Sequence, residues 1–186
     1  MLLKRRLPRI QTDTTQTNEG FEHLDAAALA VLRWLKANHV EFVLVGPVAA
    51  AIRGQEFDYG PVAIVPAPYR RNLERLARAL DAANAAIRLD GVGIGGDADT
   101  TPTKLTAEKL SRGALWTLRC GGYDLDIEAN VPGLTSYQNL LYEAGKYEPA
   151  PGISVEVASP EDIEHCAHIR RTGSPPEIRI MRAAPP

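Results

Sequence analysis

The sequence predicts an α/β (α+β) protein in which a mixed β-sheet is flanked by helices. Short apolar runs alternate with amphipathic helical segments, and two further runs are joined by a Gly-Gly turn that is typical of a β-hairpin. Of the 186 residues, 45% are hydrophobic, which is enough for the core of one domain. Residues 1–20 follow no helix or strand period, so we expect a flexible N-terminal tail before a single domain over 21–186.

The first half of this domain predicts helices and strands in alternation. Leucines recur at helical spacing after Asp25, a good N-cap residue, and Pro47 suits the first turn of a short helix. The predicted elements are a helix over 26–40, a strand over 41–46, a short helix over 47–53, a strand over 62–66 and an amphipathic helix over 69–85.

The second half predicts the hairpin and two more helices. Residues 90–104 are rich in Gly, Asp and Thr and predict a loop, and Ser159 followed by Pro160 indicates the start of the last helix. The predicted elements are a short helix ended by Gly113, strands over 114–120 and 123–129, a helix over 136–144, a strand over 153–158 and a helix over 159–171.

Composition excludes several classes of protein. A net charge of −2 argues against a dedicated nucleic-acid-coating protein, and two cysteines are too few for a disulfide scaffold. No apolar run approaches the ~20 residues that span a bilayer. The first ten residues contain no apolar stretch long enough for a signal peptide, so we expect a cytoplasmic protein without a membrane partner.

Residues 42–66 carry a resemblance to a known family. They read FVLVGPVAAAIRGQEFDYGPVAIVP: an apolar strand that ends in Gly46, a short helix and a second apolar strand. This order resembles the nucleotidyltransferase superfamily, in particular small bacterial members related to toxin–antitoxin and abortive-infection proteins. The later stretch YDLDIEANVPGLTSYQNLL resembles the family's strand with its third carboxylate, which puts that acid at Asp126. The resemblance covers residues 25–171 and implies a nucleotidyltransferase-like fold.

The residues that carry the family's chemistry are mostly missing. In the family the first strand ends in Gly-Gly or Gly-Ser, where this chain has Gly46 and Pro47, and the second strand holds two acids, where it has Pro61 and Ala63. Such enzymes bind two Mg²⁺ ions through carboxylates, and neither Pro61 nor Ala63 offers a side-chain oxygen. Pro47 also lacks the backbone N–H that a phosphate would use. We therefore expect a degenerate site in a pseudoenzyme, with Asp126 as its remaining catalytic position, no metal and no cofactor.

A row of acids leaves an enzymatic alternative open. Asp124, Asp126 and Glu128 alternate with apolar residues, so they lie on one face of their strand and together could bind a cation. In that case Mg²⁺ and a nucleoside triphosphate are needed, and a nucleoside monophosphate moves to a hydroxyl acceptor. The same alternation is typical of a strand whose polar side faces solvent. The predicted nucleotide-binding positions are Gly46, Pro47, Pro61, Ala63, Asp124 and Glu128.

The last predicted helix holds a second candidate metal site. His165 and His168 are three residues apart and flank Cys166, but a metal would need further ligands from elsewhere in the chain. We expect two histidines on the helix surface and a cysteine in the core.

These observations give one leading hypothesis and two alternatives. The leading hypothesis is a nucleotidyltransferase-fold protein that binds a nucleotide, a protein or an RNA and performs no metal-dependent transfer. The first alternative is the active Mg²⁺-dependent nucleotidyltransferase. The second is a structural or oligomerisation module in which packable residues fill the pocket. The sequence leaves the oligomeric state open.

Overall fold

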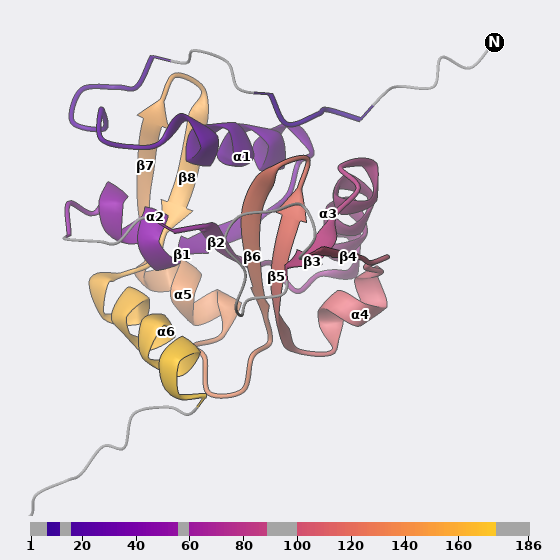
Figure 1. Cartoon of the computed structure of the whole chain (residues 1–186). Helices are drawn as coiled ribbons and strands as arrows, with labels where there is room; N and C mark the ends of the chain where they lie inside the picture. The colour runs from indigo at the N-terminus through magenta and orange to yellow at the C-terminus, as the bar shows by residue number, and fades with distance from the viewer. Residues whose placement is uncertain (1–6, 12–15, 56–59, 89–99, 174–186) are drawn as a thin grey trace, which may run out of the picture.

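An eight-stranded mixed sheet forms the centre of the molecule, and helices pack against it (Figure 1). The computed structural model describes residues 7–11, 16–55, 60–88 and 100–173. The strands are β1 (Phe42–Val45), β2 (Val62–Pro66), β3 (Ala86–Arg88), β4 (Thr100–Pro102), β5 (Ala114–Cys120), β6 (Tyr123–Ala129), β7 (Gly145–Ala150) and β8 (Ile153–Val157). The helices are α1 (Ala26–Ala37), α2 (Gly46–Ile52), α3 (Arg70–Ala82), α4 (Ala107–Ser111), α5 (Tyr137–Glu143) and α6 (Pro160–Thr172).

The strand directions make the sheet mixed, as predicted. The spatial order is β4-β3-β5-β6-β2-β1-β8-β7. β1 runs antiparallel to β2 and parallel to β8, whereas β2 runs parallel to β6. The end of β1 and the beginnings of β2 and β6 therefore lie at the same edge of the sheet.

The predicted helix caps and hairpin turn are present. Asp25 accepts a hydrogen bond from the backbone N–H of Ala27, and the hydroxyl of Ser159 accepts one from Asp162. Capping in this way satisfies backbone N–H groups that have no partner within the helix. Gly121 and Gly122 join β5 to β6 with φ angles of 57° and 90°, the positive values that a two-residue hairpin turn requires.

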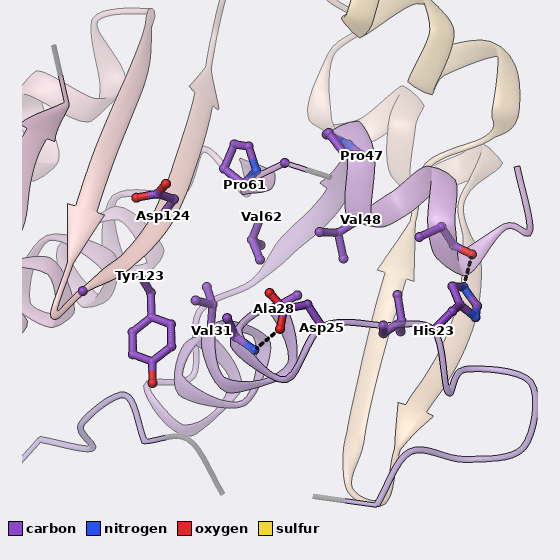
Figure 2. Close-up of a pocket in the computed structure, with 15 residues that line it drawn as sticks. His23, Asp25, Ala28, Val31, Pro47, Val48, Pro61, Val62, Tyr123 and Asp124 are labelled. Atoms are coloured by element: carbon purple, nitrogen blue, oxygen red, sulfur yellow. Dashed lines mark hydrogen bonds between the residues drawn. The ribbon is translucent and has the colours of Figure 1, made fainter. Parts of the chain in front are cut away.

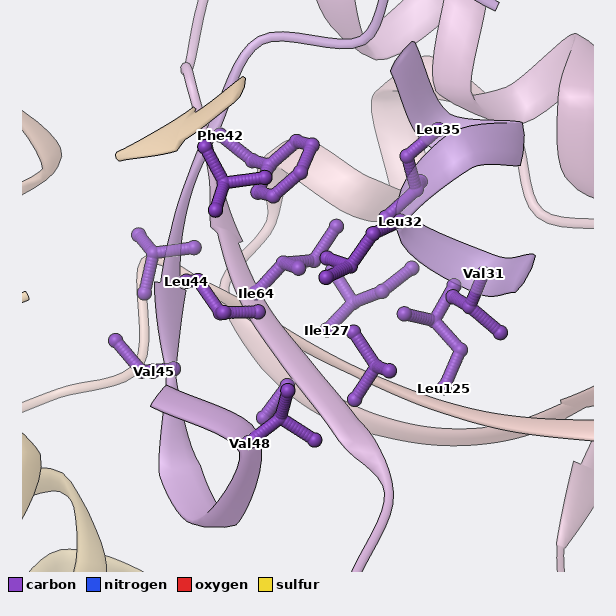
Figure 3. Close-up of a cluster of buried hydrophobic side chains, with 14 of the residues drawn as sticks. Val31, Leu32, Leu35, Phe42, Leu44, Val45, Val48, Ile64, Leu125 and Ile127 are labelled. Atoms are coloured by element: carbon purple, nitrogen blue, oxygen red, sulfur yellow. The ribbon is translucent and has the colours of Figure 1, made fainter. Parts of the chain in front are cut away.

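The main core lies between the sheet and α1 (Figure 3). Leu32 and Leu35 of α1 face the side chains of the three central strands, which include Leu44, Ile64 and Ile127. All five residues are fully buried. Strand side chains alternate between faces, so the residues between these on β2 and β6 point to the other side of the sheet. That second side carries Ala63 and the row of acids.

The structure adds three short strands to the predicted set. β3 and β4 pair at one end of the sheet, and β7 pairs with β8 at the other. The prediction of a loop over 90–104 was wrong for Thr100–Pro102, which pair with β3, while 89–99 lie outside the described residues. These strands form at the sheet ends through pairing with existing strands, and the three residues of β3 and of β4 are too few to show a period of two.

The segment before α1 contacts the outer strand of the sheet. The backbone N–H of Asn18 donates to Pro149 O at 2.9 Å, and its side-chain amide donates to Glu148 O. Both acceptors belong to β7, the strand at one edge of the sheet.

In the part of the chain that the structure describes, no helix has the length and apolar character needed to span a bilayer. α3 and α6 have 13 residues each, against the ~20 that a membrane-spanning helix needs.

Candidate functional site

The end of β1 approaches the beginning of β2 at Gly46. This residue has a φ of 70°, and a Cβ added there would lie 2.9 Å from the Cβ of Ala63. Only glycine avoids both the backbone strain and the close contact. Ala63 is in turn the register partner of Asp126 on β6. Three of the predicted site residues therefore lie side by side on the second face of the sheet.

A cavity of about 420 Å³ opens at the same edge (Figure 2). We call it the edge cavity. It lies between the start of α1, α2 and the first residues of β2 and β6. Its lining residues are His23, Leu24, Asp25, Ala27, Ala28, Val31, Pro47, Val48, Ala51, Gly60, Pro61, Val62, Gly122, Tyr123 and Asp124.

Of the predicted site residues, Pro47, Pro61 and Asp124 line the edge cavity. The others, Gly46, Ala63, Asp126 and Glu128, are not among its lining residues. The predicted positions thus divide into a cavity group and a buried group.

The side chains that bring charge to the edge cavity are mainly acidic. Asp25 is held by its capping bond to Ala27, and the Nε2 of His23 lies 3.0 Å from Ala51 O (Figure 2). Asp124 is the second carboxylate of the lining. Pro47 stands in the first turn of α2, where it supplies no backbone N–H. Asp124 is paired with Arg88 and Arg119, so an anionic ligand would meet the carboxylate of Asp25 here, with one amide donor fewer than a proline-free turn offers.

Two of the three acids in the row are buried on the second face of the sheet, and Asp124 is partly exposed. Asp126 is 3% exposed and Glu128 is 1% exposed. The interpretation of this face as solvent-facing was therefore wrong. The row faces α6, which covers this part of the sheet and reaches it through Arg170.

Three arginines neutralise the three acids. Arg88 from β3 bridges two of them, with Nη1 2.9 Å from Asp124 and Nη2 2.8 Å from Asp126. Arg119 from β5 donates through Nε to Asp124 at 3.0 Å. From α6, Arg170 binds the second oxygen of Asp126 at 2.9 Å and also Oε1 of Glu128. We call these six residues the ion-pair cluster.

Burial and charge shift pKa values within the ion-pair cluster. Burial raises the pKa of Glu128; Arg170 opposes this shift and Asp126 adds to it. Burial lowers the pKa of Arg170, but the nearby Glu128 and Asp126 outweigh that effect and raise it overall. The guanidinium thus stays charged and remains the counter-ion of two carboxylates.

The ion-pair cluster does not fit a Mg²⁺ site. A divalent cation needs carboxylate oxygens free to coordinate it, and both oxygens of Asp126 are bonded to arginines. A bound cation would also lie among three positive side chains. Within residues 7–11, 16–55, 60–88 and 100–173, no group of three or more His, Cys, Asp or Glu side chains is arranged to hold a metal ion.

Arg53, the residue that follows α2, ties this helix to β8. It donates to the backbone oxygens of Val157 and Ala158 at 2.9 and 3.0 Å, and its guanidinium lies 5.1 Å from the ring centre of Tyr147. These contacts hold the end of α2 against the β7–β8 hairpin.

The histidine and cysteine group on α6 is as expected. Cys166 is buried, and the partly exposed His165 lies 2.8 Å from Gly133 O through Nε2. Burial, followed by Glu128 and Asp162, raises the pKa of Cys166 to about 12. Burial, followed by Asp124, raises the pKa of Cys120 to about 12 as well.

Both thiols should therefore react with Ellman's reagent at pH 8 at least ~100-fold more slowly in the native protein than in guanidinium-unfolded protein. Unfolding restores an ordinary thiol pKa near 9.0, so the free energy of unfolding should fall as pH rises from about 9 to about 12. Fast labelling of either cysteine before unfolding would contradict the buried positions described above.

Sequence reasoning found the three acids but missed their partners. Arg88 belongs to a short strand that was not predicted, and Arg119 and Arg170 looked like ordinary surface charges of a strand and a helix. One signal was available: buried carboxylates need counter-charges, so a row of acids on a central strand predicts arginines nearby. Arg88 and Arg170 lie 38 and 44 residues from Asp126 in the sequence, and no local pattern indicates that they pair with it.

No family model matches the chain, and none of the curated proteins matches it.

Proposed function

We propose that this protein has a nucleotidyltransferase-like fold and acts by binding a small molecule in the edge cavity, without metal-dependent nucleotidyl transfer. The proposal rests on the ion-pair cluster, in which arginines form ion pairs with the carboxylates that a metal would need as ligands.

The positions of Ala63 and Asp126 support the fold part of the proposal. The ungapped match to the family put Ala63 at an acid position of the second strand and Asp126 at the third acid. Acids that share a metal must lie together, and these two residues are register partners on adjacent strands. Gly46, matched to the conserved end of the first strand, packs against Ala63.

The same contacts support the absence of transfer chemistry. Breaking a buried ion pair leaves an uncompensated charge, which costs roughly 3–5 kcal/mol. To bind Mg²⁺ through one oxygen, Asp126 would have to give up Arg88 or Arg170. The alternative of an active enzyme requires this rearrangement in every catalytic cycle.

The edge cavity indicates the kind of ligand. Its volume of about 420 Å³ lies within the range of roughly 300–1,000 Å³ that is typical of small-molecule sites. Asp25 opposes a triphosphate and offers an acceptor to a ligand that donates hydrogen bonds. Val31, Val48 and Pro61 supply apolar walls. An uncharged molecule of nucleoside size fits this chemistry better than a nucleoside triphosphate does.

Thermal unfolding with a ligand panel tests the proposal. The panel holds the four ribonucleosides and the four ribonucleoside triphosphates, each with Mg²⁺ and with EDTA. A ligand at about 100 times its dissociation constant adds about 2.7 kcal/mol of stability, which a melting curve detects readily. We expect a nucleoside to raise the melting temperature equally with Mg²⁺ and with EDTA, and its triphosphate to bind more weakly.

Two variants locate the site. Pro61→Phe should abolish the shift by filling the cavity from its partly exposed rim, whereas Leu115→Phe, on an exposed position of β5, should leave it unchanged. A Mg²⁺-dependent shift by a triphosphate that Asp126→Asn removes would favour the active enzyme instead. The absence of any shift across the panel would contradict small-molecule binding and favour a protein or RNA partner.

A further inference from the structure

A second cavity opens beside the beginnings of β1 and β8. We call it the lateral cavity, and its volume is about 360 Å³. β1 and β8 pair first at Val43 and Glu156, so the residues before these two are not joined by that ladder. The lining comes from this unpaired part of both strands, from Glu156 itself, from the end of α1, from the start of β7 and from α5.

Part of the wall of the lateral cavity is apolar and buried. Val40, Phe42 and Val155 line it and are each at most 6% exposed. Leu141 of α5 adds a partly buried apolar side chain. The volume lies within the range of roughly 300–1,000 Å³ that is typical of small-molecule sites. A small molecule with an apolar side chain therefore fits this wall.

The rim of the lateral cavity carries charges of both signs. Lys146 of β7 is exposed and Glu156 of β8 is partly exposed. The two are register partners on neighbouring strands, which places their Cβ atoms about 5 Å apart on one face of the sheet. Among the described residues, neither side chain has an ion pair or a hydrogen bond. Both charges are thus accessible to a ligand.

The acidic side of the lateral cavity surrounds the hydroxyl of Tyr137. Burial, followed by Glu41, Tyr69 and Glu156, raises the pKa of this hydroxyl, so both carboxylates of the lining act on it electrostatically. The hydroxyl has no hydrogen-bond partner among the described residues. Glu41 is paired with Arg75 at 3.4 Å, which leaves Glu156 as the carboxylate available to a positively charged ligand group.

We propose that the lateral cavity binds a free α-amino acid with a large apolar side chain. The ammonium group binds Glu156 and the hydroxyl of Tyr137, the carboxylate binds Lys146, and the side chain packs on Phe42 and Val155. An α-amino acid carries both charges on one carbon atom, which matches two opposite charges on neighbouring strands. The proposal does not depend on the proposed function, because none of these residues lines the edge cavity.

Ligand-observed NMR titrations with three matched compounds test this site. L-phenylalanine carries both charges, phenethylamine lacks the carboxylate, and hydrocinnamate lacks the ammonium group. We expect L-phenylalanine to bind the wild-type protein roughly tenfold more tightly than either analogue, because each analogue loses one hydrogen-bonded contact with a charged side chain.

Two variants assign the contacts. Glu156→Gln should weaken the binding of L-phenylalanine and phenethylamine roughly tenfold and leave hydrocinnamate unchanged. Lys146→Met should weaken the binding of L-phenylalanine and hydrocinnamate and leave phenethylamine unchanged. Neither side chain has a described partner, so both variants should fold, which circular dichroism checks. Glu164→Gln, at an exposed position of α6, should leave all three affinities unchanged.

Three results would each overturn the proposal. They are equal affinities of the wild-type protein for the three compounds, binding of L-phenylalanine that both variants leave unchanged, and no binding of L-phenylalanine at millimolar concentration. If a variant does not fold, the comparison of the three compounds on the wild-type protein still decides the question.

Discussion

Replacing Arg170 with methionine should lower the free energy of unfolding by about 3–5 kcal/mol at pH 7, because the change leaves Glu128 buried without its counter-ion. Asp126 also loses one of its two arginines. Methionine keeps an apolar side chain of similar length, so the loss reports mainly on charge. Urea denaturation followed by circular dichroism measures the effect.

The pH dependence and two further variants separate this effect from simple loss of packing. Without Arg170, the carboxyl of Glu128 loses the interaction that lowers its pKa, so its pKa in the folded protein rises further above the ordinary value. The stability cost should therefore be small below about pH 4.5 and grow as pH rises through that folded pKa. Arg171→Met, at the exposed neighbouring position, should change stability by less than about 0.5 kcal/mol. Adding Glu128→Leu to Arg170→Met should recover part of the loss. A cost independent of pH would contradict the ion-pair explanation.

Asn72→Ala should cost about 2–4 kcal/mol, since one buried side chain joins α3 to the sheet. Asn72 is 1% exposed. Its oxygen accepts from the backbone N–H of Glu41 at 2.8 Å, and its amide donates to the backbone oxygens of Glu41 and Ala67. Truncation removes the Asn72 partner of the Glu41 N–H and of Ala67 O, whereas Glu41 O keeps the backbone N–H of Ala67 at 2.9 Å. Each buried unsatisfied group costs roughly 1–3 kcal/mol.

The same urea titration measures this loss, with Asn139→Ala as the matched control. Asn139 is exposed on α5, so its replacement removes no buried side-chain contact. A loss of less than about 1 kcal/mol for Asn72→Ala, equal to the control, would contradict the bonding described for this residue.

The sequence predicts most of the central fold, because its local signals are strong there. Asp25 and Ser159 have the side chains that cap helices, and the apolar runs of β1 and β2 are buried on both faces as their composition indicates. The Gly121–Gly122 turn determines the register of the hairpin. The end strands β3, β4 and β7 could not be predicted, since they depend on pairing with strands distant in sequence.

The candidate site was predictable in part. Gly46, Ala63 and Asp126 lie together because a short helix and two parallel strands bring matched positions to one edge. The environment of Asp126 was not predictable, because it depends on where Arg88 and Arg170 arrive in the folded chain. A solvated strand face, a metal site and an ion-paired core have the same alternating acids, and only tertiary structure distinguishes them.

Mn²⁺ binding tests the central claim most directly, since Mn²⁺ shares the oxygen-ligand preference of Mg²⁺ and its free form gives an electron paramagnetic resonance signal. The free Mn²⁺ signal is measured as the wild-type protein is added, alone and with ATP. We expect the signal to stay at its protein-free intensity up to millimolar protein, because arginines hold the carboxylates of the ion-pair cluster. Stoichiometric loss of the signal at micromolar protein, restored in Asp126→Asn, would show that these acids bind metal and would contradict the account.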